Sequence, residues 1–161
     1  MVVTINGTTG ITTPGVSSSD NIVTTGSGFI SSATTLNSTG DAFMQQSLIA
    51  DSYQETSVDL TGTTPTIDCA TGNVFNLTTS GNTTFQAATN VPTTGTGYGF
   101  MLKLTAGGTH TVDYSSLGTN VYFAGGTAPD APASGETDIL VFTTIDGGST
   151  WYGALSIDAA S

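Results

Sequence analysis

The only histidine of the chain is His110, so any zinc site or Ser-His-Asp arrangement that needs an imidazole must use it. Within residues 108–114 it begins a predicted strand, residues 110–114. Asp113 follows three positions later, and an odd spacing on a regular strand places two side chains on opposite faces. No Gly-x-Ser-x-Gly nucleophile elbow is present. We therefore expect a structural role for His110 and no enzymatic activity.

Carboxylates form the second group of reactive side chains. Three of them, Asp130, Glu136 and Asp138, lie in or beside one predicted loop, residues 124–137. Calcium takes six to eight oxygen ligands, so these residues are the calcium candidates, and we expect no other cofactor. The alternative is that the acids keep an otherwise uncharged β surface soluble and block edge-to-edge pairing. A glycosidase needs two carboxyls flanking one bond, and the dispersed acids do not indicate such a pair.

Aromatic residues could form a stacking platform for a glycan if they are exposed together. The candidates are Trp151, Tyr152, Tyr98 and Tyr122. On a regular strand Trp151 and Tyr152 point to opposite faces, so at most one of them lies in the core.

Lys103 is the sole lysine and falls within a predicted strand. A lysine near an asparagine and an acid could form an intramolecular isopeptide bond. The alternative, which we favour, is a solvated side chain on an outer face.

Charge narrows the possible partners. The 161-residue chain has one basic residue against 12 acidic ones, a net charge of -11, and only 8% charged residues. Binding to nucleic acid requires several Lys or Arg to neutralise phosphates, and docking on anionic lipid has the same requirement. Neither partner is expected. No segment approaches the ~20 apolar residues of a membrane span, and the N-terminus lacks the basic and apolar regions of a signal peptide.

The remaining composition, rich in Thr and Gly with 37% hydrophobic residues, indicates an all-β protein. Short segments bounded by Gly, Asn and Pro predict an antiparallel β-sandwich or jelly roll over residues 51–161. The expected strands are 54–60, 65–69, 74–79, 83–87, 99–105, 110–114, 121–123, 138–145 and 150–157. The clearest element is the hairpin around Asp146-Gly-Gly, where apolar residues alternate on both sides of the turn.

Residues 1–50 have few large apolar side chains and predict an extended Thr/Gly-rich arm with short strands. A short helix over residues 41–53 competes there with a strand. We expect the arm to gain order by packing on another surface. Its candidate contact residues are Val2, Val3, Ile5, Ile11, Ile22, Val23, Phe29 and Ile30.

Four segments carry a resemblance to known proteins. They are residues 67–85 (IDCATGNVFNLTTSGNTTF), 100–105 (FMLKLT), 121–129 (VYFAGGTAP) and 138–153 (DILVFTTIDGGSTWYG). Together they resemble β-sandwich virion structural proteins of marine tailed bacteriophages, over roughly residues 53–157. Residues 14–23 (PGVSSSDNIV) look more loosely like short β modules of phage fibres.

The resemblance implies a non-enzymatic virion module, usually homotrimeric, of the capsid-decoration or tail-fibre type. A short chain with an arm and one knob favours a capsid decoration (cement) protein that binds the shell through its arm. Its partners would be sister copies and the major capsid protein or another virion protein. It would be made in the host cytoplasm and located on the outer surface of the capsid, or on the tail. The alternative is a tail-fibre or glycan-binding adhesin subunit.

Overall fold

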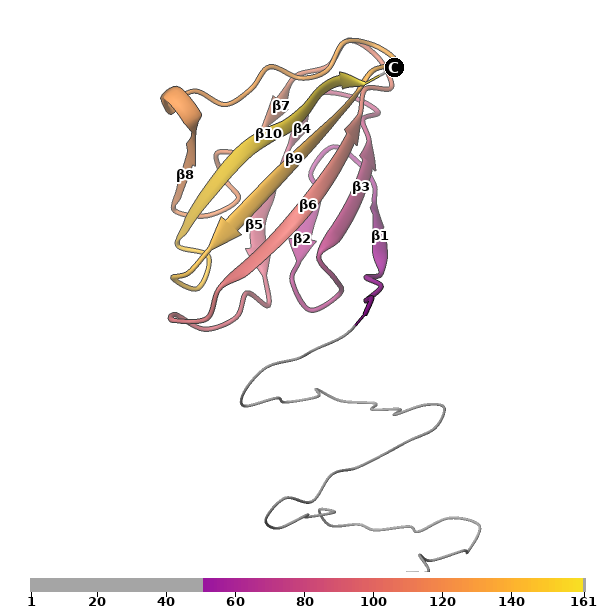
Figure 1. Ribbon diagram of the computed structural model, residues 1–161. Helices are drawn as coiled ribbons and strands as arrows, with labels where there is room; N and C mark the ends of the chain where they lie inside the picture. Colours follow the sequence, from indigo (N-terminus) through magenta and orange to yellow (C-terminus); the bar gives the residue numbers. More distant parts are fainter. Residues whose placement is uncertain (1–50, 161) are drawn as a thin grey trace, which may run out of the picture. The chain divides into compact units, whose positions relative to one another are not determined.

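The computed structural model describes residues 51–160 (Figure 1). The predicted arm, its short strands and its eight contact residues lie outside the described residues. Most of the segment 41–53, where a helix competes with a strand, also lies outside them.

The described residues consist of strands with almost no helix, so the all-β prediction is confirmed. The ten strands are β1 (Ser57–Leu60), β2 (Thr66–Asp68), β3 (Val74–Thr78), β4 (Thr83–Thr84), β5 (Gln86–Thr89), β6 (Tyr98–Thr105), β7 (Val112–Asp113), β8 (Asn120–Phe123), β9 (Thr137–Thr144) and β10 (Thr150–Ala160). A single 3-10 turn, Ala124–Gly126, follows β8. Residues 51–160 contain no helix that is long and apolar enough to cross a membrane.

Six strands form the main sheet, called sheet A, in the order β1-β3-β6-β9-β10-β8. The predicted antiparallel order is wrong for most of the fold. Five of the seven strand pairings are parallel, and only β6 with β9 and β9 with β10 are antiparallel. The expected hairpin between β9 and β10 is confirmed.

Behind sheet A lie β2, β4, β5 and β7 (Figure 1). The segment containing β4 and β5 runs between two other segments, residues 63–65 and residues 111–113. Its backbone amides donate hydrogen bonds alternately to one and to the other. Thr84 and Gln86 donate to the carbonyls of Thr63 and Pro65, while Thr83 and Phe85 donate to those of Thr111 and Asp113. These short strands therefore make a second layer in which all the pairings are parallel.

The parallel order follows from the path of the chain. β1, β3 and β6 belong to sheet A, while β2, β4, β5 and β7 alternate with them in the second layer. Packed sheets lie about 10 Å apart, a distance that a connection of a few residues can span. Each crossing returns the chain to its layer in the original direction, so residues 57–113 wind as a coil. The glycine-containing segments that separate the expected strands in this half are crossings between layers, not hairpin turns.

The core lies between the two layers. Sheet A contributes inward-facing side chains such as Phe75, Leu102 and Leu140, and the second layer contributes Ile67 and Phe85. Fully burying one such side chain stabilises the fold by roughly 1.5–3 kcal/mol relative to exposure.

Trp151 lies at the aromatic end of this core. Its ring meets that of Phe100 edge-on, with centroids 5.4 Å apart, and Phe100 stacks on Phe142 at 5.0 Å.

Neighbouring turns of the coil touch at a glycine. A Cβ on Gly107, in the crossing from β6 to β7, would collide with the carbonyl oxygen of Thr79, in the crossing from β3 to β4. The same crossings are joined by the amide of Gly107, which donates to the Thr79 hydroxyl at 3.2 Å.

Candidate functional site: the outer face of sheet A

The outer face of sheet A is the surface that faces away from the second layer. Along β6 the side chains alternate between the two faces, since Phe100, Leu102 and Leu104 are buried while Lys103 is exposed and Met101 is half-buried. The same alternation in β9 and β10 brings apolar side chains to the outer face. Their positions follow from the strand register, which aligns residues in rows across the sheet.

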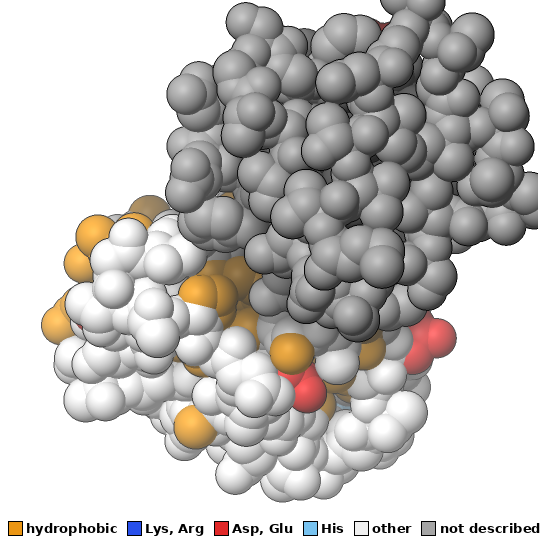
Figure 2. All heavy atoms as spheres, turned by 90° about the horizontal axis from the view of Figure 1, so that it is seen from below, with side chains coloured by type: hydrophobic (Ala, Val, Ile, Leu, Met, Phe, Trp, Pro, Cys, Tyr) orange, Lys and Arg blue, Asp and Glu red, His pale blue; other side chains and the backbone are white. Residues whose placement is uncertain are grey.

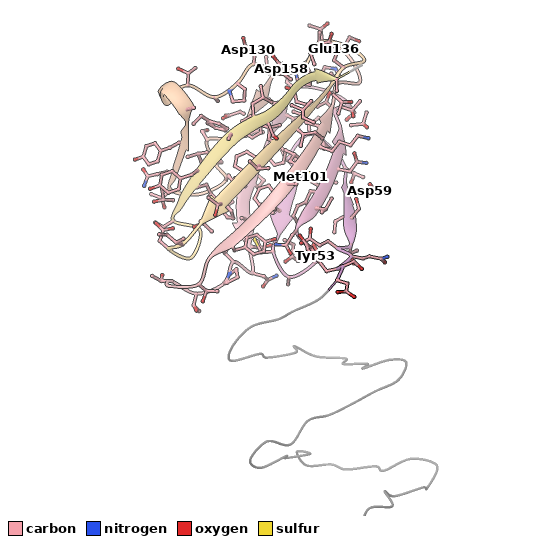
Figure 3. All side chains as sticks on the ribbon, in the orientation of Figure 1. Tyr53, Asp59, Met101, Asp130, Glu136 and Asp158 are labelled. Atoms are coloured by element: carbon pink, nitrogen blue, oxygen red, sulfur yellow. The ribbon has the colours of Figure 1, made fainter. Side chains whose placement is uncertain are left out.

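The central row of this face is apolar. Val141 in β9 pairs with Met101 in β6 on one side and with Ala154 in β10 on the other. Met101 pairs in turn with Val74 in β3. Met101 lies near the middle of the sheet (Figure 3), and Val141 is 42% exposed.

An aromatic pair forms the next row. Tyr122 in β8 and Tyr152 in β10 are register partners, with ring centroids 5.9 Å apart and an interplanar angle of 35°. Their exposed fractions are 52% and 53%. The pair therefore presents two aromatic faces to solvent at one side of the sheet.

The row on the other side of the centre is mixed. Ile157 and Ile139 pair across β10 and β9, and Ile139 pairs with Lys103. Lys103 is followed across the sheet by Asn76 and Asp59, and the Asn76 amide donates to the Asp59 carboxylate at 3.0 Å. The Lys103 side chain is exposed, as predicted for a solvated side chain on an outer face. The isopeptide alternative stays a prediction.

We define the apolar face as six residues of these rows: Tyr122, Tyr152, Val141, Met101, Ile139 and Ile157. None carries a charge. Exposed apolar side chains that are contiguous mark sites of interaction on soluble proteins. Figure 2 views the molecule from below, and there the visible surface of the described residues is mostly uncharged, with a few acidic side chains and no basic one.

Only two of the four residues of the expected glycan platform lie together on the surface. Trp151 is fully buried, so the expectation that it belongs to an exposed platform is wrong. Its strand register turns it inward and turns Tyr152 outward. Tyr98 is half-buried, its hydroxyl donates to the carbonyl of Gly72 at 2.6 Å, and burial raises the pKa of this phenol. Of the four candidates, only Tyr122 and Tyr152 are exposed and adjacent.

The calcium candidates have separate partners. Asp138 is buried and accepts a hydrogen bond from the amide of Ala159 at 2.9 Å, while Glu136 accepts one from the amide of Ala133 at 3.3 Å. Asp130 lies in the long loop before β9, at the same end of the domain as Glu136 (Figure 3). Across residues 51–160, no three acidic, His or Cys side chains lie in a group that could hold a metal ion.

His110 and Asp113 form hydrogen bonds with different segments of the chain. A ring nitrogen of His110 lies 2.9 Å from the Thr79 hydroxyl, whereas Asp113 accepts a hydrogen bond from the amide of Ser115 at 2.8 Å. The bonds from Ser115 lower the pKa of Asp113. Each of the two side chains therefore has a hydrogen-bond partner of its own.

Sequence reasoning missed the apolar face itself, although β9 carries its signal. Ile139 and Val141 are apolar as well as Leu140 and Phe142, so both faces of this strand are apolar. Such a run is typical of a strand covered on both sides. In the described residues only the inner side of β9 is covered.

Comparison of the chain with protein-family models, with curated proteins and with solved structures found no match.

Proposed function

We propose that this chain is a non-enzymatic structural protein of a tailed-bacteriophage virion, and more specifically a capsid decoration protein. Residues 1–50 would bind the assembled shell, and the C-terminal domain would form a β-sandwich knob that associates as a homotrimer. The partner would be the major capsid protein or another virion protein, at the outer surface of the capsid.

The apolar face is the observation that carries this proposal. A sheet surface with Val141, Tyr122 and Tyr152 substantially exposed has the character of a contact surface. Because residues 53–157 resemble phage virion modules, we assign this contact surface to a protein of the virion.

Decoration would stabilise the shell by mass action. A protein that binds the assembled shell, and not its open form, shifts the equilibrium towards the assembled state. An arm that becomes ordered on binding can cover a large surface, at an entropic cost incurred during assembly.

The copy number in purified particles tests this function. Cryo-EM combined with quantitative mass spectrometry is expected to find hundreds of copies on the shell. A few copies at the tail would contradict decoration. A chain lacking residues 1–40 is expected to lose shell binding while its knob stays folded, and undiminished binding would refute the role of the arm.

The exposed pair Tyr122 and Tyr152 favours a second candidate, a tail-fibre or receptor-binding adhesin that stacks a sugar on these rings. Glycan-array binding that is lost in Tyr152→Ser would favour this candidate. Tail location in the particle would support it independently.

A further inference from the structure

We propose that the apolar face is the surface through which copies of this chain associate, so that a second copy covers Val141 and its neighbours. This inference rests on the proposed self-association of the chain, but neither on the number of copies nor on the location of the protein in the virion. The partner that we propose for this face is another copy of the same chain. Three features of the face support this choice: its charge, its area and its composition.

Charge restricts where two copies can meet. Each copy carries a net charge of -11, so two copies repel each other at most orientations. All acidic residues except Asp20 and Asp41 fall within residues 51–160. Of these, only Asp59 lies in the rows described above, and Lys103, the single cation of the chain, lies in the same row. Contact through these rows therefore brings few carboxylates together.

The whole outer face of sheet A approaches the area of a standard interface, and the apolar face lies on four of its six strands, β6, β8, β9 and β10. Six strands about 4.8 Å apart span roughly 24 Å, and eight residues at about 3.3 Å each span roughly 26 Å. The flat sheet thus covers about 600 Å² before its side chains add area. A standard interface buries about 800 Å² from each partner.

The composition of the face suits the centre of an interface. Tyrosine and methionine are enriched at interfaces, whereas charged residues are depleted from their centres. Val141 and Met101 lie in the central row of the face, with the tyrosine pair in the row on one side. The charged pair Lys103 and Asp59 lies in the row on the other side, towards the β1 edge.

The test is the mass of the full chain and its variants in solution, measured by light scattering and sedimentation velocity from about 1 to 100 µM. Val141→Glu and Val141→Lys each place a charge at the centre of the face. The matched control is Tyr53→Glu, which adds the same charge at a residue that is 79% exposed and precedes β1. Urea unfolding of each variant checks that the domain stays folded.

We expect the unmodified chain and Tyr53→Glu to form the same closed oligomer, and both Val141 variants to be monomeric. Dissociation of the oligomer by Val141→Glu but not by Val141→Lys would overturn the inference. It would indicate that added negative charge, and not a charge at the centre of the face, separates the copies. A monomeric unmodified chain would overturn it as well. Raising the salt concentration from about 20 to 500 mM is expected to tighten association, because it screens repulsion between the acidic copies.

The outcomes separate this inference from the proposed function. A dimer that both Val141 variants dissociate sustains the inference and contradicts the homotrimer. A chain that is monomeric alone but loses shell binding in Val141→Glu refutes the inference and leaves decoration standing, with a different virion protein covering the face.

Discussion

The two faces of sheet A are built from the same strands but differ in kind. The inner face carries Phe75, Leu102 and Trp151, each fully or almost fully buried. The outer face carries Val141 and Tyr152, which are apolar but about half exposed. The contrast teaches that hydrophobicity alone does not identify the core of this protein. The inner residues stabilise the fold, and the outer ones are available for contact.

Substitution of Trp151 is expected to have the largest effect. Trp151→Ala removes a fully buried ring that contacts Phe100, so it should lower the free energy of unfolding by about 3–5 kcal/mol. Urea denaturation measures this change. Trp151→Phe serves as the control, because it keeps an aromatic ring in the core and should cost less. A loss below about 1 kcal/mol in Trp151→Ala would mean that the ring does not anchor the inner face.

A glycine substitution sharpens the contrast between buried and open positions. Gly107→Ala places a methyl group against the Thr79 carbonyl, where two turns of the coil touch, and should cost about 1–3 kcal/mol. Gly97→Ala is the matched control, since a Cβ there meets nothing within 4 Å. Thermal unfolding of both variants gives the comparison. Equal stability of the two would argue against close contact between the turns.

Tyr152→Thr should change the free energy of unfolding of the isolated domain by less than about 1 kcal/mol. The ring is 53% exposed, and threonine suits a strand as well as tyrosine does. Urea denaturation at concentrations where the chain does not associate makes the measurement. A cost comparable with that of Trp151→Ala would break the distinction between the two faces.

The smallest effect concerns the hairpin turn. Asp146 accepts hydrogen bonds from the amide of Thr150 and the hydroxyl of Thr144, each at 2.9 Å, and the bonds from Thr150 are the main cause of its lowered pKa. Because this pKa is lowered in the folded state, the Asp146 carboxylate stabilises the fold at pH values above its unfolded pKa, about 3.9. This stabilisation is lost as the pH falls through the folded pKa. Asp146→Asn should therefore show a shallower loss of stability between about pH 4 and pH 2. Identical acid unfolding curves would contradict this.

The sequence predicts the strands and their faces well, because alternation is a local property. Alternation places Leu140 and Ile139 on opposite faces, and likewise Trp151 and Tyr152, but it does not say which face of the strand is the inner one. Strand partners are not local. A turn such as Ser80-Gly81-Asn82 looks the same whether it closes a hairpin or crosses between layers, so the parallel winding was not predictable. The apolar face was missed for a related reason, since Met101 and Val141 become neighbours only through the pairing of β6 with β9.

The winding of the chain also has a kinetic consequence. The β9–β10 hairpin pairs Tyr152 with Thr143, whereas β3 and β6 pair Val74 with Met101 across a much longer loop. Closing a longer loop costs more entropy and slows folding. The hairpin should therefore nucleate folding, and the coil should dock onto it late. We expect φ-values near Phe142 in β9 to exceed those near Phe75 in β3, and the reverse order would place the nucleus in the coil.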